Sequence, residues 1–157
     1  MSTSQLMLLA TIPKVSGTFS LLGSFAVIYD VARDEKKRQT TYHRLMLGVS
    51  ISDLLSSVAF IMGTWAMPKG STSGALGTVG TCDFFGFIGQ VGTLSAALYN
   101  VVLATYYVLM LKFRWSSTKL KQRAEPWFHA FAILCAISVG ITASVKRLFG
   151  AAIYVCW

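Results

Sequence analysis

The chain has 157 residues, of which 54% are hydrophobic and only 13% are charged, and its mean hydropathy is +0.59. Soluble domains carry about 25% charged residues, so this composition argues against a soluble four-helix bundle with a polar outer face on each helix. The formal net charge of +8 would suit a nucleic-acid-binding protein, but the cationic residues lie at the ends of apolar segments, without an aqueous stacking platform. We therefore expect no nucleic-acid partner and take the lipid bilayer as the surroundings of most residues.

Four apolar segments follow one another along the chain, at residues 15–32, 45–67, 84–111 and 127–145. A helix that crosses about 30 Å of hydrocarbon needs about 20 mostly apolar residues. The segments therefore predict an all-α transmembrane helical bundle with four spans, and residues 1–157 as a single transmembrane domain.

The cationic residues predict the direction in which the spans cross the membrane. Most of the 14 lie in two loops: Arg33, Lys36, Lys37, Arg38 and Arg44 in the first, and Lys112, Arg114, Lys119, Lys121 and Arg123 in the second. Short cationic loops stay in the cytoplasm, so residues 33–44 and 112–126 are expected inside. Residues 1–14, 68–83 and 146–157 are then extracellular. We expect a multi-pass protein of the plasma membrane with its N-terminus outside, whose basic loops touch anionic headgroups.

The second span contains a carboxylate, Asp53. A charged carboxylate near the bilayer centre costs about 2.5–3.5 kcal/mol on insertion scales, so this side chain is expected to face protein or water. Ser50, Asp53 and Ser57 share one helical face. Two interpretations stay open: these residues hold a cation with water, or a protonated Asp53 hydrogen-bonds to a neighbouring helix.

Polar and small residues also recur along the third span, at intervals of three and four. They are Gln90, Thr93, Ala97, Asn100, Ala104 and Tyr107. We call this row of residues the polar stripe. Such a stripe is expected to turn towards the bundle interior, where Asn100 would join Ser50, Asp53 and Ser57 in a polar network. Gln90 and Thr93, in the outer half, are candidate ligand-facing residues; packing between helices is the alternative.

The motifs of catalysis and of metal binding are missing. The spans contain a single intramembrane carboxylate rather than an acid–base pair, and no His-Glu-x-x-His, Cys-x-x-Cys or glycine-rich phosphate loop occurs. We expect no enzyme activity, cofactor or metal. Of the three cysteines, Cys135 is a small apolar filler of the fourth span. Cys82 and Cys156 are both expected on the oxidising side, where they form a disulfide or stay free.

Several short motifs together resemble a known family. Tyr42-His43-Arg44 leads into Ser-Ile-Ser-Asp-Leu at residues 50–54, which is similar to the second helix of seven-transmembrane receptors. Residues 82–90, Cys-Asp-Phe-Phe-Gly-Phe-Ile-Gly-Gln, resemble the start of the third helix in cyclic-AMP-receptor-like proteins, and Leu98-Tyr99-Asn100 follows. Cys156-Trp157 resembles the Cys-Trp pair in the second outer loop of secretin-like (family 2) receptors. The chain thus resembles the first four helices of a G-protein-coupled receptor of the cyclic-AMP-receptor-like or secretin-like branch.

The resemblance carries several implications. It implies a disulfide between Cys82 and Cys156, an unidentified extracellular ligand, and a heterotrimeric G protein at the inner loops. The cytoplasmic candidates are Arg38, Arg44, Lys112, Arg114, Lys119, Lys121 and Arg123. Because it covers about half of a receptor, it also implies an N-terminal fragment whose signalling belongs to the intact form. The Asp-Arg-Tyr motif of rhodopsin-like receptors is absent from the end of the third span, where residues 104–107 are Ala-Thr-Tyr-Tyr. This difference argues against the rhodopsin-like branch and not against a receptor. The alternative is a four-span membrane scaffold or transporter subunit without receptor activity.

Overall fold

The computed structural model of the protein describes residues 3–71, 74–151 and 156–157. Four long helices dominate it: α1 (Thr3–Arg33), α3 (Thr41–Met62), α4 (Val79–Leu111) and α6 (Glu125–Val145). Short elements join them: α2 (Glu35–Gln39), the 3-10 turn η1 (Gly63–Ala66), α5 (Ser117–Lys119) and the π-helical turn η2 (Leu120–Ala124). The described residues include two isolated β-bridges and no strand. The prediction of an all-α four-helix bundle is confirmed.

Four segments are long and apolar enough to cross a membrane: Ala10–Arg33, Thr41–Ala66, Val79–Leu111 and Ser117–Val145. By length and composition they support a multi-pass membrane protein. All four helices begin before the apolar segments seen in the sequence, because helical geometry does not stop at the edge of the hydrocarbon, whereas α3 ends at Met62, before the predicted end at residue 67. In α1, for example, the helix passes through Pro13 and ends at Arg33. Large apolar side chains such as Phe19, Phe25 and Leu134 are exposed on the bundle surface, as expected for residues that face lipid.

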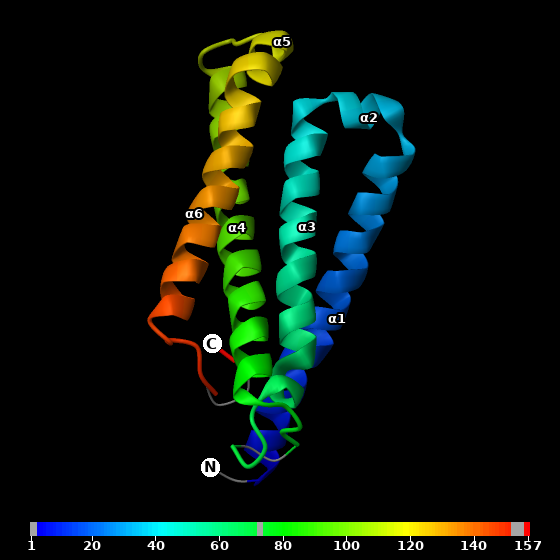
Figure 1. Ribbon diagram of the computed structural model, residues 1–157. Coiled ribbons are helices and arrows are strands. Elements are labelled where there is room, and N and C mark those ends of the chain that lie inside the picture. The colour runs from blue at the N-terminus through cyan, green and yellow to red at the C-terminus, as the bar shows by residue number, and fades with distance from the viewer. Residues whose placement is uncertain (1–2, 72–73, 152–155) are drawn as a thin grey trace.

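The long helices stand side by side, with α1 against α3, α3 against α4, and α4 against α6. Figure 1 shows α2 and α5 at one end of the molecule and both chain termini at the other. We call the end with α2 and α5 the inner end, because it holds the two basic loops, and the opposite end the outer end.

Small residues let the helices approach closely. Gly92 of α4 is buried, and a Cβ atom added there would lie 2.6 Å from the backbone nitrogen of Ser56 in α3. Gly140 of α6 likewise allows close contact with α4, because a Cβ atom added there would lie 2.7 Å from Cγ2 of Val91. In lipid, where apolar burial does not drive helix association, such close packing is the main attraction between helices.

Two clusters of buried, mostly apolar residues lie towards the two ends of the bundle. The inner-end core consists of Leu45, Tyr99, Val102, Tyr106, Leu120 and Ala132. The outer-end core consists of Ala66, Met67, Cys82 and Cys156. The inner-end core joins α3, α4, η2 and α6.

Candidate functional site

Asp53 lines an open cleft between α1, α3 and α4. The cleft has a volume of about 430 Å³, and its walls include Ser20 of α1, Ser57 of α3 and Thr93 of α4. Asp53 is half-buried, and its side chain forms no hydrogen bond or ion pair within the described part of the chain. The carboxyl group therefore lies at membrane depth beside several hydroxyl groups, where it is free to accept a hydrogen bond from a further helix or from water.

The four residues expected in one polar network are not brought together. Asp53 and Ser57 line the same cleft, whereas Ser50 is buried and is not among the cleft-lining residues that the structure describes. The amide of Asn100 donates to the carbonyl oxygen of Ala96, one turn earlier in its own helix, at 3.0 Å. Asn100 thus satisfies part of its hydrogen-bonding capacity locally, and its side chain is not part of a cluster around Asp53.

The sequence predicts that the polar stripe of α4 turns towards the bundle interior. In the four described helices it does not. Thr93, Ala97, Asn100, Ala104 and Tyr107 are all exposed, and Gln90 is half-buried. The interior is instead occupied by another face of α4. Its members are Cys82, Gly86, Gly89, Gly92, Ser95, Ala96, Tyr99, Val102 and Tyr106. The physical reason is that glycines allow α3 and α6 to come closer than threonine or asparagine would.

Of the two candidate ligand-facing residues, Thr93 lies on the wall of the Asp53 cleft. Gln90 is absent from that wall within the described residues. Asp53 belongs to α3 and Thr93 to α4. The cleft thus brings together a carboxyl and a hydroxyl group that are 40 residues apart in the sequence.

A polar network at the inner end was not foreseen from the sequence. Glu125, in the first turn of α6, accepts hydrogen bonds from the hydroxyl of Thr41 at 2.7 Å and from Nη2 of Arg44 at 2.8 Å, both on Oε2. Arg44 Nε lies 2.7 Å from Oε1 of the same carboxylate. His129 Nε2 is 4.0 Å from this Oε1, and His129 Nδ1 shares a 2.8 Å hydrogen bond with the hydroxyl of Tyr99. The network therefore joins α3, α4 and α6.

Among the cytoplasmic basic candidates, Arg44 differs from the others. Arg38, Lys112, Arg114, Lys119, Lys121 and Arg123 are exposed. The Arg44 side chain keeps 33% of its surface exposed and pairs with Glu125. Arg44 is thus a residue of the helix interface rather than a free cation of the inner loop. The sequence carried no signal that distinguished Arg44 from the other loop cations, because its partner lies 81 positions away on another helix.

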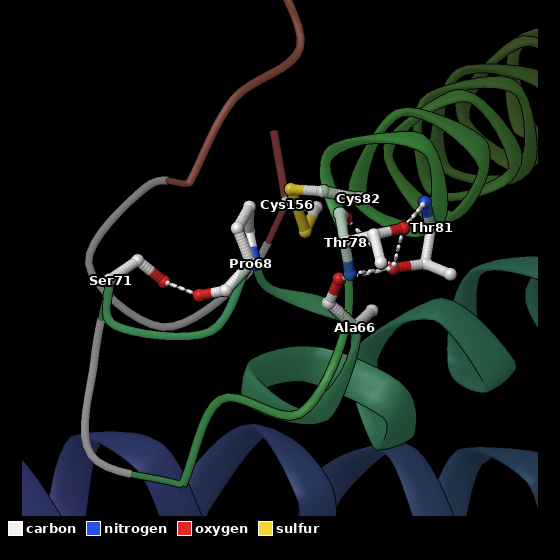
Figure 2. Close-up of a disulfide and its surroundings, with 7 residues drawn as sticks. All are labelled: Ala66, Pro68, Ser71, Thr78, Thr81, Cys82 and Cys156. Carbon is white, nitrogen blue, oxygen red and sulfur yellow. Dashed lines mark hydrogen bonds between the residues drawn. A yellow bond between two sulfur atoms is a disulfide. The ribbon is translucent and has the colours of Figure 1, made fainter.

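At the outer end, a disulfide joins Cys82 in the first turn of α4 to Cys156, with Cα atoms 5.1 Å apart. This is the pair that the receptor resemblance implies. Figure 2 shows the disulfide beside Ala66, Thr78 and Thr81. Thr78 and Thr81 form a capping box at the start of α4, and the Thr81 hydroxyl donates to the carbonyl oxygen of Ala66 at 2.9 Å.

The chain that follows α6 lies across the start of α4. Phe149 packs on Gly86, where a Cβ atom would come within 3.0 Å of its ring. The backbone of Trp157 exchanges two hydrogen bonds with Gly150, at 3.0 and 3.1 Å. The disulfide and these contacts together attach the outer connection to the third span.

Residues 3–71, 74–151 and 156–157 contain no group of three or more His, Cys, Asp or Glu side chains placed to hold a metal ion. No protein-family model matches the chain, and no curated protein matches it.

Proposed function

We propose that this chain forms the first four helices of a seven-transmembrane receptor similar to the cyclic-AMP-receptor-like and secretin-like branches. In the intact protein, an extracellular ligand would shift the helices between two arrangements, and the basic inner loops would contact a heterotrimeric G protein. The observation that carries the proposal is the Cys82–Cys156 disulfide. It ties the connection after the fourth span to the outer end of the third, as the receptor resemblance implies.

The polar surfaces left open at membrane depth support the proposal independently. Asp53 lies in an open cleft, and Thr93 and Asn100 are exposed on α4. Polar groups at this depth are unfavourable against lipid and are normally covered by protein or water. Further helices, packed against α1, α3 and α4, would cover both the cleft and the stripe. A receptor with three more spans supplies such helices.

The same surfaces favour one alternative. A four-span scaffold or transporter subunit would cover the stripe with a partner protein instead of with its own later helices. The two possibilities differ in the coding sequence. Reading the transcript past the codon for Trp157 is expected to reveal three further apolar spans. An authentic stop codon at that point would overturn the receptor proposal and favour the alternative.

We further propose a plasma-membrane location with the outer end, including the N-terminus, outside the cell. The disulfide supports this orientation because disulfides persist on the oxidising side of the membrane. Trypsin added to intact cells is expected to cleave after the exposed Lys69 at the outer end and to spare Lys121 and Arg123 at the inner end. Cleavage at the inner pair with Lys69 spared would contradict the orientation.

Coupling to a G protein can be tested on the intact protein without its ligand. A heterotrimeric G protein depleted of nucleotide is expected to co-purify with the receptor. Replacing Lys119, Lys121 and Arg123 together by alanine should lower the recovery several-fold. A matched control replaces Lys69 and Lys146, which are exposed at the outer end. Equal losses from the two sets of changes would count against a G-protein contact at the inner loops.

A further inference from the structure

A second, larger cleft opens at the inner end, between the start of α3, the end of α4 and the α5–η2 segment. Its volume is about 700 Å³, within the range of ligand-binding pockets. The residues that line it are mostly polar in type and include Gln39, Thr40, Thr118, Lys121 and Gln122. This inner cleft is separate from the Asp53 cleft, and the receptor proposal assigns it no role.

Two of the residues that line the inner cleft, Thr41 and Tyr106, are buried and carry hydroxyl groups. The Thr41 hydroxyl already donates to Glu125. Tyr106 as a whole is only 6% exposed, but its hydroxyl is not among the buried polar atoms that lack a partner, and it forms no hydrogen bond to the residues that the structure describes. The hydroxyl therefore stays accessible from the cleft and is available to a ligand oxygen.

The charges around the inner cleft favour an anion. Lys121 lies on its wall, and Lys119 and Arg123 are exposed cations of the same α5–η2 segment that do not line the cleft themselves. None of these three cations forms an ion pair with a described side chain. The nearby carboxylate of Glu125 is neutralised by Arg44. An unpaired cation surrounded by hydroxyl and amide groups is a chemical environment suited to phosphate oxygens and sugar hydroxyls.

The position of the cleft selects the kind of anion. The cleft lies where two spans, Thr41–Ala66 and Ser117–Val145, begin. This is the level of the lipid headgroups, on the side where positive loops face the anionic leaflet. We propose that the inner cleft binds a phosphorylated inositol, held by Lys121 on a phosphate and by the hydroxyls of Tyr106 and Thr118 on phosphate or ring oxygens. The headgroup of a phosphoinositide lipid and a soluble inositol phosphate share this chemistry.

Titration in nanodiscs tests the site. The full chain is placed in phosphatidylcholine nanodiscs, and binding of short-chain phosphatidylinositol bisphosphate is compared with binding of short-chain phosphatidylserine at matched total charge. We expect the phosphoinositide to bind at least about tenfold more tightly, because it offers several charged oxygens to a fixed set of donors. Equal affinity for the two lipids would reduce the effect to diffuse attraction and overturn the proposal.

Substitutions locate the binding. Lys121→Ala is expected to weaken phosphoinositide binding about tenfold, as loss of one charge-assisted contact predicts. Tyr106→Phe keeps the packed ring and should weaken it several-fold through the hydroxyl alone. Lys146→Ala removes an exposed cation at the outer end and is the matched control. A loss for Lys146→Ala as large as that for Lys121→Ala would overturn the assignment. The melting temperatures of the variants show whether each one is folded.

Soluble inositol trisphosphate identifies the source of the ligand. If it competes with the lipid at similar concentrations, the inner cleft recognises the phosphorylated ring itself, and a soluble inositol phosphate is a ligand. If it competes only at much higher concentrations, the lipid form is the ligand. Both results support the site, whereas no competition at any concentration would contradict recognition of the phosphorylated ring.

Discussion

Arg44 and Glu125 form a two-point ion pair that fastens the start of α6 to the start of α3. Arg44 Nε lies 2.7 Å from Oε1, and Nη2 donates to Oε2 at 2.8 Å. The Glu125 side chain is only 9% exposed, and the Thr41 hydroxyl donates to the same oxygen as Nη2. Only the Nη2 contact is a hydrogen bond, because Nε has no hydrogen-bond partner among the described residues and contributes to the pair as a close charge. The pair therefore aligns two spans whose contact residues lie far apart in the sequence.

Breaking this pair should destabilise the bundle strongly. Arg44→Met leaves the buried Glu125 carboxylate without its cation, and such losses typically cost about 3–5 kcal/mol. The double variant Arg44→Met/Glu125→Leu removes both charges and is expected to recover much of the loss. The measurement is the free energy of unfolding in mixed micelles, from titration with sodium dodecyl sulfate. Equal instability of the single and double variants would contradict this account.

The Asp30–Lys37 pair provides a matched control. Lys37 Nζ lies 2.6 Å from Oδ2 of Asp30, but the Asp30 side chain is 64% exposed. Exposed ion pairs contribute about 0–1 kcal/mol, so Lys37→Met should change the unfolding free energy little. A loss as large as that of Arg44→Met would mean that burial does not distinguish the two pairs.

The hydrogen bond between Tyr99 and His129 should contribute more modestly. Tyr99 is 3% exposed, and its hydroxyl lies 2.8 Å from His129 Nδ1. Tyr99→Phe keeps the ring, which packs over Gly48, and removes only the hydroxyl. We expect a loss of about 0.5–1.5 kcal/mol in the same titration. Tyr29→Phe, at a position that is 59% exposed, should leave the unfolding free energy unchanged. A similar loss in both variants would show that the measured loss does not come from this hydrogen bond.

The disulfide predicts a specific proteolysis product. Trypsin cleaves after lysine and arginine, so Cys82 falls in the fragment 70–112 and Cys156 in the fragment 148–157. Without reductant, mass spectrometry of a digest of the membrane-inserted protein should show the two fragments linked, and reductant should separate them. The fragment that holds Cys135, residues 124–146, should have the same mass in both digests. Unlinked fragments before reduction would remove the strongest support for the receptor proposal.

The sequence was sufficient to predict the four helices and their number, because apolar length is a local property that needs no knowledge of neighbours. It was not sufficient to predict which face of each helix is buried. The stripe that contains Thr93 and Asn100 had the expected spacing, yet α4 buries its glycine face instead. Spacing identifies a face, but the contact itself depends on how closely two backbones approach, which is a property of a pair of helices.

The inner-end network was missed for a related reason. Arg44 was counted among the loop cations because its partner lies on a distant helix. Glu125 lies in the predicted inner loop 112–126, and an acidic residue beside a proline at the start of a helix is common. One sequence does not show which cation pairs with a distant carboxylate, since every lysine and arginine of the loops is an equal candidate.

The close contact at Gly92 leads to a final prediction, which compares two glycines of the membrane-spanning helices. Alanine favours a helix over glycine by about 0.8–1.0 kcal/mol, so Gly23→Ala, where no atom lies within 4 Å of the added Cβ, should stabilise the protein. At Gly92 the same Cβ would lie 2.6 Å from the Ser56 nitrogen and 2.9 Å from the Ser52 oxygen, both backbone atoms of α3. Overpacking of this kind costs about 1–3 kcal/mol, which outweighs the gain in helix propensity. Gly92→Ala should therefore lower the melting temperature in detergent while Gly23→Ala raises it. Equal stabilisation by both changes would mean that α3 and α4 do not pack backbone to backbone at Gly92.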